Sequence, residues 1–132
     1  MFVSGSSTVV VRSEGAVAED QEDVLGVYRL VDSHQDRPLY QQAGGENFLY
    51  FSPPASWLVG TVAGGQYGWL RNVSHQAATV TWPADLAGGW QYRDRLTASW
   101  REDDLSLRVQ PLPGEAGDSD FSSLCHCVNI LT

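Results

Sequence analysis

Residues 37–72 read RPLYQQAGGENFLYFSPPASWLVGTVAGGQYGWLRN, and this stretch decides the fold class. It carries seven large aromatic rings on short segments, which are separated by two Gly-Gly pairs and one Pro-Pro pair. Aromatic residues are enriched in β-strands, whereas glycine and proline mark the turns between them. The stretch therefore predicts several short strands that share an aromatic core.

The segment at residues 48–51 is apolar on both sides of its backbone. Side chains alternate between the two faces of a strand, so Phe48 and Tyr50 share one face and Leu49 and Phe51 share the other. A strand with two apolar faces needs cover on both of them. We therefore expect this segment to be a central strand of the sheet.

Further strand candidates flank this segment on both sides. Turn signals separate them every eight to twelve residues, a spacing typical of antiparallel sandwiches and small barrels. No segment of the body shows the apolar stripe of a substantial helix. The sequence predicts an all-β fold, a compact antiparallel sandwich or small barrel of about eight short strands, with candidates at residues 27–31, 38–41, 56–60, 67–70, 78–82, 90–93 and 105–109.

The charge divides the chain into three parts. Residues 24–110 hold eight acids against seven arginines, a net charge of −1, whereas residues 1–23 carry −4 and residues 111–132 carry −3. We expect residues 24–110 to be the β-domain. The preceding segment is an acidic lead-in with a candidate edge strand at residues 8–12, and the last 22 residues form a linker and a C-terminal appendage, irregular or with a short helix.

The overall charge argues against several partners. The net charge is −8, with eight arginines and no lysine, so no basic patch is available for nucleic acid or for an anionic membrane surface. No window approaches the roughly 18 apolar residues of a transmembrane helix. The N-terminus lacks the basic start of a secretory signal, which favours an intracellular or organellar location.

The triplet Cys125, His126 and Cys127 is the most conspicuous candidate metal site in the sequence. Three adjacent residues cannot comfortably supply three bonds to one zinc ion, and His34 and His75 have no ligand-like spacing. The sequence therefore predicts no metal site and no cofactor.

No residue pattern predicts catalysis. The adjacent acids Asp103 and Asp104 lie at an expected turn, where a solvated role is favoured over a glycosidase pair. There is no glycine-rich phosphate loop before a helix and no nucleophile elbow. The glycosylation pattern Asn72-Val73-Ser74 is interpreted as a chance match because short sequons are common. We predict that the chain is not an enzyme.

The remaining signal is a group of aromatic and polar residues that could form a binding surface. Rings beside arginine and amide groups suit a protein partner, and also the faces of sugars. The favoured function is a non-catalytic interaction module, or a peripheral subunit of a larger assembly, that binds a protein. The candidate binding residues are Trp57, Tyr67, Trp69, Arg71 and Asn72.

Two alternatives stay open. A carbohydrate-binding, lectin-like module requires at least two aromatic rings exposed together beside polar groups. The other alternative is a small-ligand β-barrel or an enzyme with an unrecognised site. The ligand barrel requires an internal cavity of several hundred cubic ångströms.

Residues 26–109 resemble a small aromatic-rich β-module that occurs as repeats in multidomain proteins of protists and marine invertebrates. The resemblance covers about two-thirds of the chain and rests on scattered positions. It implies a structural or binding unit and transfers no functional residue. The matching residues are Gly26, Tyr28, Arg37, Pro38, Leu39, Tyr40, Asn47, Phe48, Leu49, Tyr50, Phe51, Trp57, Leu58, Val59, Gly60, Gly68, Trp69, Pro83, Trp90 and Trp100.

Overall fold

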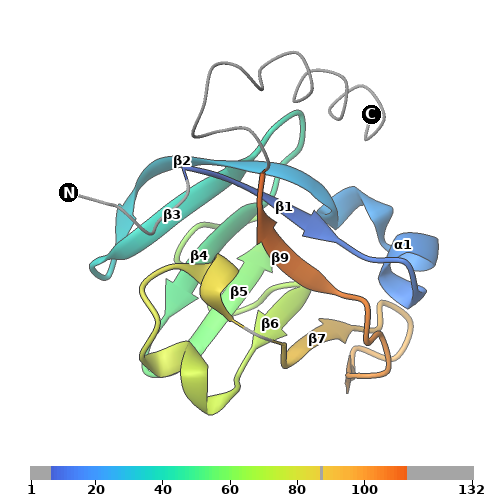
Figure 1. Ribbon diagram of the computed structural model, residues 1–132. Helices are drawn as coiled ribbons and strands as arrows, with labels where there is room; N and C mark the ends of the chain where they lie inside the picture. Colours follow the sequence, from blue (N-terminus) through green and yellow to red (C-terminus); the bar gives the residue numbers. More distant parts are fainter. Residues whose placement is uncertain (1–6, 87, 113–132) are drawn as a thin grey trace.

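The computed structural model describes residues 7–86 and 88–112, and these residues form one sheet of nine antiparallel strands curled into a half-barrel (Figure 1). This confirms the predicted all-β fold. The strands are β1 (Thr8–Arg12), β2 (Gly26–His34), β3 (Arg37–Gln42), β4 (Phe48–Ser52), β5 (Ser56–Gly60), β6 (Leu70–Asn72), β7 (Trp90–Arg93), β8 (Trp100–Arg101) and β9 (Arg108–Pro111).

The strand order explains why the sheet curls. The order is β8-β7-β6-β5-β4-β3-β2-β1-β9, so β8 and β9 lie at opposite ends of the sheet although they are consecutive in the chain. In a flat sheet of nine strands these ends would lie about 38 Å apart. The connection at residues 102–107 spans at most about 25 Å. The sheet must therefore bend until its two ends approach each other.

The first strand lies inside the sheet, contrary to the expected edge strand. β1 pairs with β2 on one side, where Val10 is opposite Val27, and with β9 on the other, where Val11 is opposite Val109. Its three consecutive valines are all buried. The N-terminal segment thus supplies a structural strand because its valines cover both faces of the sheet.

The segment between β1 and β2 packs against the half-barrel, although the sequence suggests a solvated linker there. It forms α1 (Ala16–Asp20) and the 3-10 helix η1 (Glu22–Val24). Val17 and Val24 are buried in the core, and the side-chain amide of Gln21 donates a hydrogen bond to the backbone oxygen of Arg93 on β7. The acidic side chains stay outside while these apolar and amide groups hold the segment in place.

The long connection between β6 and β7 replaces the strand expected at residues 78–82. It contains the 3-10 helices η2 (His75–Ala78) and η3 (Pro83–Asp85). The Arg37 side chain donates hydrogen bonds to the backbone oxygens of Ala78 and Val80, and these bonds take the place of a strand ladder. The alternation of Ala78, Val80 and Trp82 was therefore misleading, since Val80 and Trp82 pack on the core from a connection.

The expected strand at residues 105–109 is shorter than its apolar alternation suggests. Its regular part begins only at Arg108, because Leu107 donates its backbone N–H to Asp104 in a turn. Leu107 and Val109 are buried, whereas Leu105 is exposed.

The segment at residues 48–51 is a central strand, as predicted. β4 lies between β3 and β5, and Leu49, Tyr50 and Phe51 are all buried. The phenol of Tyr50 donates a 2.8 Å hydrogen bond to the backbone oxygen of Gly65, so the β5–β6 loop covers the outer face of this strand.

Candidate functional site

The structure separates the five predicted binding residues by burial. Trp57 and Asn72 are 0% exposed, Trp69 and Arg71 are half-buried, and Tyr67 is 75% exposed. The sequence-based expectation that all five face a partner therefore does not hold for Trp57 and Asn72.

Trp57 and Asn72 are buried because they occupy one register position on the inner face of the sheet. Trp57 on β5 is directly opposite Asn72 on β6, and Asn72 is directly opposite Trp90 on β7. Trp57 packs its ring edge-on to Phe51, with 5.6 Å between the ring centroids. These residues build the core and cannot contact a partner.

Asn72 serves as a structural amide at the end of β6. Its Nδ2 donates a 2.6 Å hydrogen bond to the backbone oxygen of Gly88, and its Oδ1 accepts from the hydroxyl of Ser74 at 2.7 Å. Both halves of the amide therefore fix the two ends of the β6–β7 connection. This burial is incompatible with use of the sequon in the folded chain.

Arg71 and Trp69 each take part in an arginine–aromatic contact. The guanidinium carbon of Arg71 lies 4.1 Å from the centre of the Trp100 ring, and that of Arg95 lies 4.2 Å from the centre of Trp69. Arg71 Nε also donates to the side-chain oxygen of Gln91, and partial burial lowers the pKa of this guanidinium. One face of each tryptophan ring is thus already covered by an arginine.

Tyr67 projects from the β5–β6 loop beside a small pocket. The pocket has a volume of about 100 Å³, and we call it the Tyr67 pocket; its lining residues are Gly60, Thr61, Tyr67, Gly68, Trp69 and Arg93. No carboxylate in the described part of the chain lies within ion-pair distance of Arg93. The pocket therefore offers one exposed ring and one cation that has no acidic partner among the described residues.

The backbone around the Tyr67 pocket is held by hydrogen bonds to two strands. The backbone N–H of Trp69 donates to the oxygen of Val59 at 2.7 Å, and the oxygen of Trp69 accepts from the N–H of Arg93 at 2.8 Å. Gly68 permits this approach, since a Cβ atom there would lie only 2.5 Å from the oxygen of Val59. Tyr67 is therefore presented from a fixed point of the loop.

The sequence reading missed the role of Asp104. The two adjacent acids are not equivalent: Asp103 is exposed, whereas Asp104 is only 5% exposed. The Asp104 carboxylate accepts from the Ser13 hydroxyl at 2.6 Å, the Val17 N–H at 3.0 Å and the Ser106 hydroxyl at 2.7 Å. It therefore ties the exit of β1 to the β8–β9 connection, where no strand ladder of the described chain joins β8 to β9.

These contacts also shift the ionisation of the two acids and of a tyrosine. Burial alone would raise the pKa of Asp104, but its hydrogen bonds outweigh burial and hold the pKa below the ordinary value. The hydrogen bond from Tyr92, followed by that from Arg101, lowers the pKa of Asp103. Burial, reinforced by Asp103, raises the pKa of Tyr92 to about 12.

The candidate metal ligands Cys125, His126 and Cys127 lie outside the described residues. Within residues 7–86 and 88–112, no group of three or more histidine, cysteine or acidic side chains is placed to hold a metal ion. No helix in the same residues is long and apolar enough to cross a membrane.

A further pocket of about 420 Å³ lies between η3 and β9. Its lining combines apolar side chains, among them Leu86, Leu107 and Val109, with the polar side chains of Arg108 and Gln110. The interior of the half-barrel itself is filled by buried side chains, among them Tyr28, Tyr40 and Trp57.

The fold and the site together define an all-β protein, a curled half-barrel of antiparallel strands with a small pocket beside the exposed ring of Tyr67. No family model, curated protein or solved structure matches the chain.

Proposed function

We propose that the protein is a non-catalytic interaction module, or a peripheral subunit of a larger assembly, that binds a segment of a protein partner at the Tyr67 pocket. The observation that carries this proposal is the exposure of Tyr67, 75%, on a loop whose backbone is pinned to β5 and β7. Rigid aromatic side chains at the surface are the residues that most often supply binding energy in protein interfaces.

The chemistry of the pocket favours a partner segment that combines an apolar side chain with a carboxylate. A volume of about 100 Å³ accommodates one side chain and is well below the several hundred cubic ångströms of a small-molecule site. The apolar side chain would pack on the rings of Tyr67 and Trp69. The carboxylate would pair with Arg93, which has no acidic partner in the described residues.

The arginine contacts favour a protein over a glycan. Sugar binding requires open ring faces beside polar groups, but Arg95 lies over Trp69 and Arg71 lies over Trp100. Tyr67 is the one aromatic residue among the described residues that stands out as strongly exposed. A single exposed ring next to a cation is better suited to a short peptide motif.

The test is selection of peptides from a random display library on the immobilised full-length protein. We expect enrichment of peptides with an acidic residue next to an apolar one. Tyr67→Ala should weaken the binding of the selected peptides by about 2 kcal/mol or more, roughly 30-fold in affinity, as expected for an interface anchor. Arg93→Gln should weaken the binding of acidic peptides. It should leave unchanged the binding of peptide variants in which an amide replaces the acid.

Leu105→Ala is the matched control, because it removes an exposed apolar side chain that does not line the Tyr67 pocket. It should leave peptide binding unchanged. The proposal is overturned if no peptide is enriched, or if Tyr67→Ala enriches and binds the same peptides as the unchanged protein.

A further inference from the structure

A second polar pocket lies on the outer face of the sheet, at the junction of β1 and β9. Val11 and Val109 point inward to the core, so their neighbours Arg12 and Arg108 point outward. These two arginines are directly opposite each other in the strand register. Side chains at opposite positions have Cβ atoms about 5 Å apart, so the two cations share one surface site.

No acid of the described residues forms an ion pair with Arg12 or Arg108. The ion pairs of the described chain involve Arg95 and Arg101. Like charges at opposite strand positions destabilise a sheet. An anion bound between the two guanidinium groups would remove that cost.

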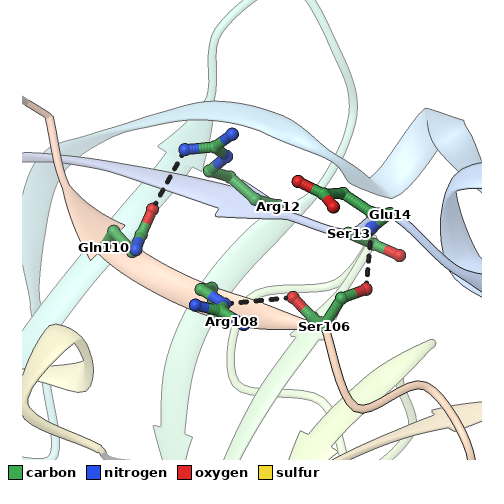
Figure 2. Close-up of a pocket in the computed structure, with 6 residues that line it drawn as sticks. All are labelled: Arg12, Ser13, Glu14, Ser106, Arg108 and Gln110. Atoms are coloured by element: carbon green, nitrogen blue, oxygen red, sulfur yellow. Dashed lines mark hydrogen bonds between the residues drawn. The ribbon is translucent and has the colours of Figure 1, made fainter.

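Neutral acceptors hold the two arginine side chains while leaving N–H groups free. Arg12 donates to the side-chain oxygen of Gln110 at 3.3 Å, and Arg108 Nε donates to the backbone oxygen of Ser106 at 3.2 Å (Figure 2). Each guanidinium has five N–H donors, so most of them remain available. The side-chain NH2 of Gln110 adds further donors at the same place.

The pocket beside these groups has a volume of about 130 Å³, and its lining residues are Arg12, Ser13, Glu14, Ser106, Arg108 and Gln110 (Figure 2). Ser13 and Ser106 form a polar rim of this pocket. The Asp104 carboxylate holds the rim in place by accepting hydrogen bonds from both hydroxyls. The hydroxyl of Ser106 also accepts the backbone N–H of Glu14 at 2.7 Å. The site thus combines two cations with a fixed polar rim.

We propose that this pocket, which we call the Arg12–Arg108 site, binds a phosphate group. One guanidinium fork satisfies the two oxygens of a carboxylate, whereas a phosphate monoester has three terminal oxygens that can accept from both arginines and from Gln110. At neutral pH its charge of about −1.5 to −2 matches the two guanidinium charges. Glu14 opposes binding, since its carboxylate lines the same pocket.

The test is an NMR titration of the nitrogen-15-labelled full-length protein with inorganic phosphate, with chloride exchanged to keep the ionic strength constant. We expect saturable shifts of the side-chain signals of Arg12, Arg108 and Gln110. Arg12→Gln and Arg108→Gln should each raise the dissociation constant about tenfold, because each removes charge-assisted hydrogen bonds. Glu14→Gln should lower it severalfold.

Arg29→Gln is the charge-matched control. Arg29 is exposed on β2, does not line the pocket and has no ion pair in the described chain. It should leave the dissociation constant unchanged. Non-saturable shifts, or equal losses from Arg29→Gln and Arg108→Gln, would show general charge attraction and overturn the proposal.

Two further ligands identify the chemistry and its source. Acetate should bind more weakly than inorganic phosphate, and equal binding would overturn the assignment to a phosphate group. Phosphoserine binding more tightly than inorganic phosphate supports the site and identifies a phosphorylated side chain as the source. Equal affinity for the two also supports the site and identifies free phosphate.

Discussion

Removal of the Asp104 carboxylate should destabilise the fold far more than removal of an exposed acid. In the half-barrel this side chain joins the β1 exit to the β8–β9 connection through bonds from Ser13, Val17 and Ser106. Asp104→Ala leaves the buried N–H of Val17 without its acceptor. Residues 13–17 and 104–106 then lose the bonds that the Asp104 carboxylate makes between them.

The magnitude follows from the number and burial of those donors. A buried donor left without an acceptor costs about 1–3 kcal/mol, and hydrogen bonds to a charged group contribute about 1.5–3 kcal/mol each. Water can replace part of the loss at the half-buried hydroxyls of Ser13 and Ser106. We therefore expect Asp104→Ala to lower the free energy of unfolding by about 3–5 kcal/mol, a large share of the total of a typical domain.

The contribution of Asp104 should also depend on pH. Its pKa in the folded protein lies below the ordinary value, so the unfolded chain binds the proton first as the pH falls. The stabilisation is fully present above the ordinary carboxyl pKa of about 4 and is lost as the pH falls through the folded pKa. The difference between the unchanged protein and Asp104→Asn should therefore shrink in acid.

Urea unfolding at neutral pH and at a series of acidic pH values measures both effects. Asp20→Ala is the control, since Asp20 is exposed at the end of α1 and should change the free energy of unfolding by less than about 0.5 kcal/mol. A loss in Asp104→Ala no larger than in this control refutes the structural role. A difference that stays constant down to acidic pH refutes the ionisation argument.

Three further predictions concern the core and the site. Trp57→Ala should lower the free energy of unfolding by about 3–5 kcal/mol, measured by calorimetry or urea unfolding, because Trp57 is buried. Tyr67→Ala should lower it by less than about 0.5 kcal/mol, because Tyr67 is exposed. Equal losses would contradict the assignment of Trp57 to the core and Tyr67 to the surface. Tyr92 has a pKa raised to about 12, so its stabilisation is complete below about pH 10 and is lost as the pH rises through 12. Tyr92→Phe also removes the hydrogen bond to Asp103, and it should reduce the loss of unfolding free energy at alkaline pH, measured by urea unfolding. An unchanged pH profile would contradict the role of Tyr92. Gly68→Ala should destabilise by about 1–3 kcal/mol, since its Cβ would lie 2.5 Å from a carbonyl oxygen of β5; full retention of stability would show that the loop can shift.

The local sequence pattern was sufficient to predict burial wherever a segment forms a regular strand with alternating apolar side chains. Phe48–Ser52 is central, as its two apolar faces predict, and Trp90 and Tyr92 on β7 are both buried. The same rule misled at residues 78–82, where the alternation is real but the backbone bonds go to the Arg37 side chain. Periodicity shows which side chains are apolar, but it does not show which groups form hydrogen bonds with the backbone.

In the candidate site, too, side-chain burial depends on contacts that the local sequence does not reveal. Trp57 and Tyr67 are both aromatic residues near glycine, and nothing in their local sequence separates the first, which is fully buried, from the second, which is exposed. The separation arises because β5 pairs with β6 and turns Trp57 toward Asn72. The pairing of Arg12 with Arg108 likewise joins residues 96 positions apart, and only strand register brings them together.

The sequence by itself determined the all-β class and the central position of residues 48–51, because each depends on composition or on neighbours along the chain. Tertiary structure alone decided the half-barrel, the internal position of β1, the burial of Asp104 and the arginine pair. These depend on contacts between distant segments. Within the described residues, β9 returns to pair with β1, so strands from the two ends of this part of the chain are neighbours in the sheet.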